Sequence, residues 1–254
     1  MATVSETLLT ADPAYDYRIK YPTSDGRPMG ETDLHRQDMF DLIESLKLFY
    51  VGQRVYVSGN LLVCYKPTNK RKHVAPDVFV VKDIDPHPRD NYLLWEEGKG
   101  PDIVFEVTSE STKEEDLDEK YELYRDVLKV REYFLFDPRS EFLKPPLQGY
   151  RLVDGRYVRI EPVNGRLPSD VLGLHLEQDG GELRLWNPEI GKWIPTHDEA
   201  REQAEQAQRK AELARKQEEQ ARKQEQQARV HAEAEVERLK KELESLRRNQ
   251  SGPE

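Results

Sequence analysis

The first clear pattern in the chain is a stretch in which apolar residues return every three or four positions. The stretch runs from Glu31 to Tyr50, and its apolar members are Leu34, Met39, Leu42, Ile43, Leu46 and Phe49. Because this spacing places side chains on one face of an α-helix, it predicts an amphipathic helix packed against a core. Gly52 is expected to end the helix.

Four later stretches are dense in β-branched and aromatic residues, which is typical of strands. They cover residues 55–65, 78–82, 103–108 and 130–137. Ser58, Gly59 and Asn60 interrupt the first stretch, so we expect a single strand with a bulge at Gly59.

A second helix is predicted between the last two of these strands. Thr112 and Glu115 have the spacing of a capping box, which would start the helix. Its buried face is expected to carry Leu117, Tyr121, Tyr124 and Leu128. The order helix, strands, helix and strand predicts a mixed α/β sheet with a right-handed crossover.

Short strands are predicted in residues 147–195. Residues 149–153 and 156–160 flank Asp154-Gly155, a two-residue turn that β-hairpins favour. Residues 183–186 form a further predicted strand. We interpret all of these strands as part of the same body as the preceding sheet.

The last part of the chain has neither Gly nor Pro between Thr196 and Asn249 and is rich in strong helix formers. A seam of small and apolar residues runs along it, with a four-residue step that resembles a stutter. Its members are Ala204, Ala207, Ala211, Ala214, Ala221, Ala228, Ala232, Val236, Leu239, Leu243 and Leu246. We predict a parallel coiled coil that makes a dimer through residues 198–249. A solitary charged helix or a disordered tail is the alternative, since an alanine seam buries little area.

The predicted organisation therefore has four parts. They are a flexible arm, a globular domain, a coiled-coil helix and a disordered end, in residues 1–16, 17–195, 196–249 and 250–254. The chain has 254 residues and a formal net charge of −10. Residues 196–254 hold 13 Lys or Arg and 14 Asp or Glu, so the remaining net charge of −9 belongs to residues 1–195. Such an acidic body argues against charge-driven nucleic-acid binding over its whole surface, although a metal and a local basic patch can reverse the field in one cleft.

Cys64 is the single cysteine, so no disulfide can form within the chain. The first residues lack the basic and apolar regions of a secretory signal, and no apolar run has the length needed to cross a membrane. These features predict a reducing, cytoplasmic location and no membrane partner.

Three charged residues carry the candidate chemistry. Asp77 opens an apolar run, Glu106 stands inside Ile103–Val107, and Lys120 lies on the predicted second helix. Two carboxylates can hold Mg²⁺ or Mn²⁺, and a lysine can neutralise charge on a phosphate, so the set suggests a metal-dependent phosphodiesterase. A plain salt bridge between Glu106 and Lys120 is the alternative, because a buried carboxylate needs a partner in any case.

Further groups could complete such a site. The main-chain carbonyl of Val107 is a candidate third metal ligand, if the end of the strand faces the cleft. A basic loop precedes Asp77 and could guide phosphate groups, although it could equally be a solvated loop. Its candidate nucleic-acid-binding residues are Lys66, Lys70, Arg71 and Lys72.

Several short motifs together give the chain a family resemblance. They are Pro76-Asp77, Val104-Phe105-Glu106-Val107 with Ser109-Glu110-Ser111-Thr112, Asp116-Leu117, Lys120 with Leu123-Tyr124, Val130-Arg131-Glu132-Tyr133 and Asp137-Pro138. With these motifs the chain resembles the Uma family of nucleases, within the PD-(D/E)XK restriction-endonuclease-like superfamily, over about residues 20–195. The resemblance implies an α/β fold with a mixed central sheet flanked by helices, to which the long C-terminal helix is added.

The resemblance also implies roles for particular residues. Asp77 and Glu106 would be metal ligands. The superfamily lysine two residues after the glutamate is Thr108 here, and its role would pass to Lys120. A carboxylate from the first helix often joins such sites. Glu31 is the best accessory candidate and His35 a possible companion, although His35 could be a mere neighbour in the first helical turn.

The leading hypothesis is an Mg²⁺-dependent enzyme that hydrolyses DNA as an endonuclease. The rival is a catalytically inactive nuclease-fold module that acts in protein assembly through its coiled coil. The net charge of −9 and Thr108 favour the rival. The sequence does not separate DNA from RNA as the substrate.

Overall fold

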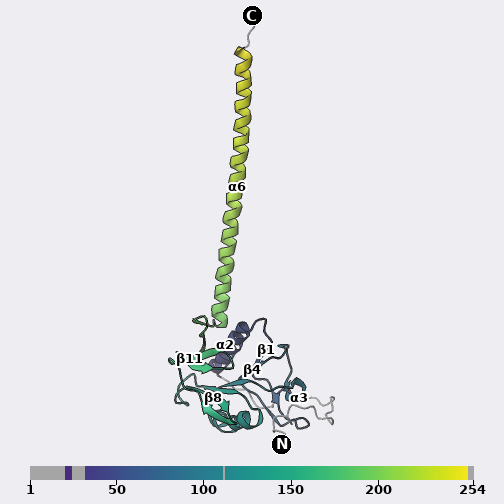
Figure 1. Cartoon of the computed structure of the whole chain (residues 1–254), viewed down its shortest axis with the longest axis vertical. Helices are drawn as coiled ribbons and strands as arrows, with labels where there is room; N and C mark the ends of the chain where they lie inside the picture. The colour runs from purple at the N-terminus through teal and green to yellow at the C-terminus, as the bar shows by residue number, and fades with distance from the viewer. Residues whose placement is uncertain (1–20, 25–31, 111, 251–254) are drawn as a thin grey trace. The chain divides into compact units, whose positions relative to one another are not determined.

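The computed structural model describes residues 21–24, 32–110 and 112–250, with side chains as far as Ser245. The chain divides into two units, Met1–His197 and Asp198–Glu254. Figure 1 draws both with their helices and strands labelled. The predicted flexible arm and four of the five residues of the predicted disordered end lie outside the described residues. Gln250, the fifth, belongs to a helix.

A six-stranded sheet forms the centre of the first unit, in the order β1-β4-β6-β7-β8-β9. β6 and β7 run parallel, and all other neighbours in this sheet are antiparallel. The bounds are Val55–Ser58 for β1, Val78–Lys82 for β4, Ile103–Val107 for β6, Glu132–Phe136 for β7, Leu147–Val153 for β8 and Arg156–Arg159 for β9. The predicted mixed α/β sheet is therefore confirmed.

Both faces of this sheet are covered, which explains why its middle strands are continuous apolar runs. Helix α2 (Asp33–Phe49) packs Met39, Leu42 and Leu46 into one core cluster with Phe105 of β6. Leu174 and Leu185 of a second sheet join the same cluster. On the opposite face, Val104 and Tyr133 belong to a different cluster. The predicted first helix is confirmed, and it ends at Phe49, before Gly52.

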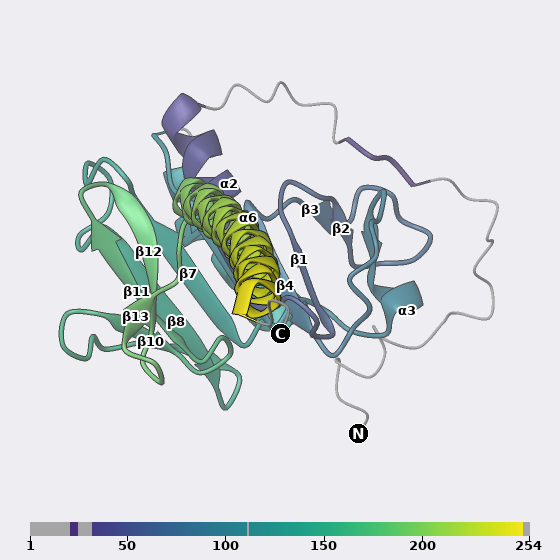
Figure 2. The same cartoon turned by 90° about the horizontal axis from the view of Figure 1, so that it is seen from above.

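Two smaller sheets flank the central one. One has the order β10-β11-β12-β13 and contains the predicted strand 183–186 within β12; its strands are Leu167–Ser169, Leu174–Asp179, Glu182–Asn187 and Lys192–Trp193. The other has the order β3-β2-β5, followed by the short helix α3; these elements are His73–Val74, Val63–Cys64, Tyr92–Leu93 and Leu94–Glu97. Figure 2 shows the four-stranded sheet at one end of the first unit and β2, β3 and α3 at the other.

The prediction of one bulged strand over residues 55–65 was wrong. This segment forms two strands, β1 and β2, which belong to different sheets. The chain leaves the first sheet at Gly59, where an added Cβ would lie 2.1 Å from the carbonyl oxygen of Asp77. The N–H of Asn60 donates a hydrogen bond to the carbonyl oxygen of Pro76 (2.9 Å). The backbone therefore crosses close to Asp77 here, and only glycine leaves room for it.

The prediction of one regular helix after Thr112 was also wrong. The segment forms α4 (Lys113–Leu117), α5 (Glu119–Glu122) and a π-helical turn, η1 (Leu123–Val127). Asp118 separates the first two with φ −115° and ψ −76°, so Leu117 is 40 % exposed, although Tyr124 and Leu128 are buried as predicted. The capping box does not form, because the Thr112 side chain makes no cap bond and its hydroxyl accepts from the N–H of Ser109.

The hairpin of β8 and β9 is confirmed. Asp154 and Gly155 both have positive φ, 48° and 76°, as a tight two-residue turn between twisted strands requires. The Leu167, Leu174 and Leu185 side chains of the following strands pack in the same core cluster as β6.

The second unit is one helix, α6, whose bounds are His197–Gln250. Its 54 residues correspond to a length of about 80 Å. Val236, Leu239 and Leu243 of the predicted seam are exposed, and ion pairs four residues apart run along the helix, such as Lys216 with Glu212. In the described residues, α6 and the other helices are too polar or too short to cross a membrane.

Candidate active site

Glu106 lies on the central strand β6 and is fully buried, with an exposed fraction of 0 %. Side chains alternate along a strand, so Glu106 projects from the same face as Val104, opposite to Phe105 and Val107. Its Oε2 lies 2.8 Å from the Nζ of Lys120 and 3.4 Å from the backbone nitrogen of Asp77.

Asp77 immediately precedes β4. β4 and β6 are antiparallel, with Val78 opposite Phe105, so the start of β4 lies beside the end of β6. The Oδ2 of Asp77 accepts a hydrogen bond from the N–H of Val107 (2.7 Å) and lies 3.4 Å from Nε2 of His35. The structure thus brings Asp77, Glu106 and Val107 together where the start of β4 lies beside the end of β6.

Lys120 of α5 reaches the same place from the helical segment formed by α4, α5 and η1. Its ammonium contacts Glu106 and also Asp116, whose Oδ1 lies 2.9 Å away. Asp116 is fully buried, and its main-chain carbonyl accepts a hydrogen bond from the hydroxyl of Tyr133 (2.9 Å). Sequence reasoning missed Asp116 as a site residue. Its position four residues before Lys120, on the same helical face, was the available signal.

Tyr124 is the second residue that sequence reasoning missed. We predicted it as a core residue, and it is buried, but its hydroxyl donates a 2.6 Å hydrogen bond to Oε1 of Glu106. A tyrosine on an apolar helical face gives no sequence signal for such a contact, because the acceptor lies on a strand 18 residues away.

The site is electrostatically unbalanced. Burial raises the pKa of Glu106; Lys120 opposes this rise, while Asp77 and Asp116 add to it. Burial also raises the pKa of Asp116, and the charge of Lys120 opposes this rise too. Burial by itself would lower the pKa of Lys120, but Glu106, Asp116 and Asp77 together raise it, so this lysine stays protonated. Lys120 thus pairs with two buried carboxyl groups, and the charge of a third, Asp77, also acts on it.

The remaining predicted residues have different outcomes. Glu31 lies outside the described residues. His35 is buried on α2 beside Asp77, and its backbone N–H donates a hydrogen bond to the hydroxyl of Thr32, the N-cap residue (3.2 Å). Thr108 is buried two residues after Glu106; its N–H donates to the carbonyl of Phe136, and its hydroxyl has no hydrogen-bond partner among the described residues. The positive charge at Glu106 comes from Lys120 instead.

The basic loop, residues 65–72, connects β2 to β3 as a hairpin, and β3 ends at Val74, three residues before Asp77. The basic side chains of the loop are exposed; they are those of Lys66, Lys70, Arg71 and Lys72. The N–H of Tyr65 donates to the carbonyl of Lys72, which closes the hairpin (3.1 Å). Its position shortly before Asp77 in the chain is compatible with a role beside the acidic site, and that role stays a prediction.

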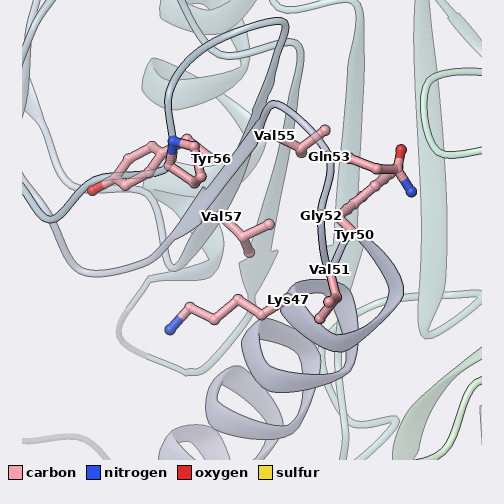
Figure 3. Close-up of a pocket in the computed structure, with 9 residues that line it drawn as sticks. Lys47, Tyr50, Val51, Gly52, Gln53, Val55, Tyr56 and Val57 are labelled. Atoms are coloured by element: carbon pink, nitrogen blue, oxygen red, sulfur yellow. The ribbon is translucent and has the colours of Figure 1, made fainter.

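A pocket of about 200 Å³ lies elsewhere, between the end of α2 and β1. Figure 3 shows Lys47, Tyr50 and Val51 on the helix side and Val55 and Val57 on the strand side. None of the predicted site residues lines this pocket, so it does not define the candidate site.

A mixed sheet that carries two acids on adjoining strand ends, with a lysine beside them, defines the class as a restriction-endonuclease-like fold. The Uma2 family, described as "Putative restriction endonuclease", matches residues 8–179, and the chain belongs to this family.

A solved structure that is similar to the chain is that of a "putative nuclease belonging to DUF820" from Anabaena variabilis ATCC 29413. The two are 12 % identical, the match covers 64 % of this chain and 92 % of that chain, and the TM-score is 0.44. No curated protein matches the chain.

Nucleases of this fold generally use divalent cations, and the donor chemistry of the site fits such an ion. Carboxylate oxygens are the hard ligands that Mg²⁺ prefers, and the carboxyl groups of Asp77, Glu106 and Asp116 outnumber the single ammonium of Lys120. In the described residues, no group of three or more His, Cys, Asp or Glu is arranged to hold a metal. Asp77 and Glu106 could hold such an ion, with the main-chain carbonyl of Val107 and water or substrate as the other ligands.

Proposed function

We propose that this chain hydrolyses phosphodiester bonds of DNA as a metal-dependent endonuclease. The observation that carries the proposal is the excess of buried carboxyl groups over ammonium groups at the end of β6. Keeping such groups together without a compensating cation costs stability. A divalent cation between Asp77 and Glu106 would remove that cost.

Each residue would have a distinct task. Asp77 and Glu106 would hold Mg²⁺ or Mn²⁺, and the main-chain carbonyl of Val107 would add a third ligand. When bound, the cation polarises the phosphate and lowers the pKa of water. Lys120 would neutralise negative charge that develops on the phosphate, because its ammonium already lies 2.8 Å from Glu106. His35 would help to orient Asp77, which it contacts through Nε2.

Binding of DNA would depend on local charge. Residues 1–195 carry a net charge of −9, so the body as a whole repels a polyanion. The exposed lysines and arginine of the loop before Asp77 would supply the local attraction, together with the cation. We expect weak, strongly salt-dependent binding in the absence of a divalent cation.

Plasmid nicking with Mg²⁺ or Mn²⁺ tests the proposal. The full chain should nick the plasmid, and Asp77→Asn or Glu106→Gln should lower the rate by about 100-fold or more, because each removes a ligand charge. Glu119→Gln is the matched control, since Glu119 is an exposed acid beside Lys120 on α5. Equal nicking by the wild type and both site variants would refute the proposal. An RNA substrate measured in parallel decides between the two nucleic acids.

The inactive module remains the second candidate function, and one observation favours it. Lys120 pairs directly with the fully buried Glu106, which is how a purely structural ion pair would look. Calorimetric titration with Mn²⁺ separates the two candidates. Binding that weakens by about 100-fold in Asp77→Asn and Glu106→Gln supports the nuclease, and absence of binding to the wild type supports the module.

We also propose that α6 pairs with α6 of a second copy as a parallel coiled coil over residues 198–249. The exposed apolar side chains Val236, Leu239 and Leu243 support this pairing, because a lone helix would leave them in water. A cytoplasmic location stays a prediction.

A further inference from the structure

The hydroxyl of Tyr124 makes an unusual contact for a core tyrosine. It donates a 2.6 Å hydrogen bond to Oε1 of Glu106, and both side chains have an exposed fraction of 0 %. Tyr124 lies in the π-helical turn η1, and its ring packs 5.1 Å from the ring of Tyr133. The phenol is thus fixed by packing, and its polar end meets the candidate metal-binding acid.

The two oxygens of Glu106 have partners of different kinds. Oε1 accepts from the neutral hydroxyl of Tyr124, whereas Oε2 faces the ammonium of Lys120 and the backbone nitrogen of Asp77. Lys120 has a second carboxylate partner, Asp116, at 2.9 Å. It can therefore leave Oε2 and keep an ion pair.

Tyr124 has no equivalent freedom. If its hydroxyl lost Oε1, a fully buried donor would be left without its acceptor, which is more costly than exchanging one ion partner for another. An incoming cation is consequently expected to replace Lys120 at Oε2 and to leave the Tyr124 bond in place.

We propose that Tyr124 is a positioning residue that occupies Oε1 of Glu106 and so presents Oε2, on the side of Asp77, to a divalent cation. The inference rests on the proposed function and specifies which carboxylate oxygen serves it. Residues that orient a metal ligand through a hydrogen bond typically change metal affinity or activity by about 10–100-fold when they are removed.

The first test is Tyr124→Phe in the full chain, with Mn²⁺ affinity measured by calorimetry in the absence of DNA. We expect an affinity about 10-fold weaker, and a kcat for plasmid nicking that falls by a similar factor while KM for the plasmid stays within about twofold. Tyr121→Phe is the matched control. It removes a hydroxyl from the same helical segment, where the Tyr121 ring packs against Tyr150 and Tyr157. Both values should stay close to wild type.

A double-mutant cycle shows whether Tyr124 acts through Glu106. In a Glu106→Gln background, Tyr124→Phe should no longer change the residual Mn²⁺ affinity. An unchanged effect in that background would overturn the inference, because the tyrosine would then act by another route.

Substitution of Tyr124 by 4-aminophenylalanine keeps a donor at the same end of the ring. Recovery of Mn²⁺ affinity and kcat relative to Tyr124→Phe supports the inference. If the phenylalanine and 4-aminophenylalanine variants show the same loss of Mn²⁺ affinity and kcat, Tyr124 has only a packing role. If both variants equal the wild type, the hydrogen bond has no role. Either result overturns the inference.

The failure of the proposed function is visible separately. A wild-type chain that neither binds Mn²⁺ through Asp77 and Glu106 nor nicks DNA refutes the nuclease and, with it, this inference. A wild type that does both, beside an equally competent Tyr124→Phe, refutes the positioning role alone.

Discussion

Three donors surround the carboxyl group of Glu106 in a place that solvent does not reach. They are the ammonium of Lys120, the hydroxyl of Tyr124 and the backbone N–H of Asp77. A buried acceptor left without a partner costs about 1–3 kcal/mol, so these donors make the acid tolerable on a central strand. The same donors fix its orientation, and this is a condition for use as a ligand.

Asp38 gives a prediction at the residue scale that concerns pH. It is 6 % exposed on α2, and its Oδ2 has no hydrogen-bond partner among the described residues. Burial, with Asp41 and Glu182 nearby, raises its pKa from 3.8 to about 7, and His35 opposes this rise. Because the folded chain holds this proton more tightly than the unfolded chain, Asp38 should reduce the free energy of unfolding as the pH rises from about 4 to above 7.

Asp38→Asn should therefore stabilise the protein at pH 8, by about 2–4 kcal/mol, and have little effect at pH 4. Urea denaturation at both pH values measures the difference, with Asp90→Asn as the control because Asp90 is exposed. A gain that is the same at both pH values would contradict the explanation by titration.

At the scale of elements, the site depends on a close crossing of two segments. The backbone of Gly59 lies close to that of Asp77, and the N–H of Asn60 donates a hydrogen bond to the carbonyl of Pro76. Asp77 in turn accepts from Val107 at the end of β6. The exit of the chain from β1 thus fixes the start of β4, and through it the position of one candidate ligand.

Gly59→Ala should disturb this crossing. The new Cβ would lie 2.1 Å from the carbonyl oxygen of Asp77 and 2.8 Å from Cδ1 of Ile43, so the backbone must move. We expect a loss of about 1–3 kcal/mol in the free energy of unfolding and weaker Mn²⁺ binding. Gly100→Ala is the matched control, since its nearest neighbour would be the Leu128 carbonyl oxygen at an ordinary 3.5 Å. Equal stability and equal Mn²⁺ affinity of the two variants would argue against a role for the crossing.

At the scale of the whole molecule, charge and apolar surface are divided unequally between the two units. Residues 1–195 hold nearly all of the net charge, whereas α6 is nearly neutral and carries an exposed apolar seam. A nearly neutral helix with an apolar seam can pair with a copy of itself without strong charge repulsion. The acidic body would then be present twice in each assembly.

Removal of residues 198–254 should lower the oligomeric state and leave the body folded, because the core clusters lie entirely before residue 198. Light scattering measures the mass, and circular dichroism checks the fold. In the full chain, Leu239→Glu with Leu243→Glu should have the same effect on mass, by placing like charges in the seam. An unchanged mass in both cases would refute pairing through α6.

Local patterns in the sequence determined much of the secondary structure of this protein. The spacing of Leu42 and Leu46 fixes α2, the apolar runs fix β4, β6 and β7, and Asp154-Gly155 fixes a hairpin turn, because each depends on residues a few positions apart. Glu106 was identifiable as a residue that needs a partner, since it is a lone charge within an apolar strand.

Only the tertiary structure decided which groups meet that charge. The bond between Tyr124 and Glu106 depends on how the helical segment packs on β6, and the division of residues 55–65 into two strands depends on the close crossing of Gly59 and Asp77. These contacts join residues distant in the chain, and their geometry is set by packing on both sides of the sheet. Sequence periodicity reports which face of an element is buried, but not which atom of a distant element lies against it.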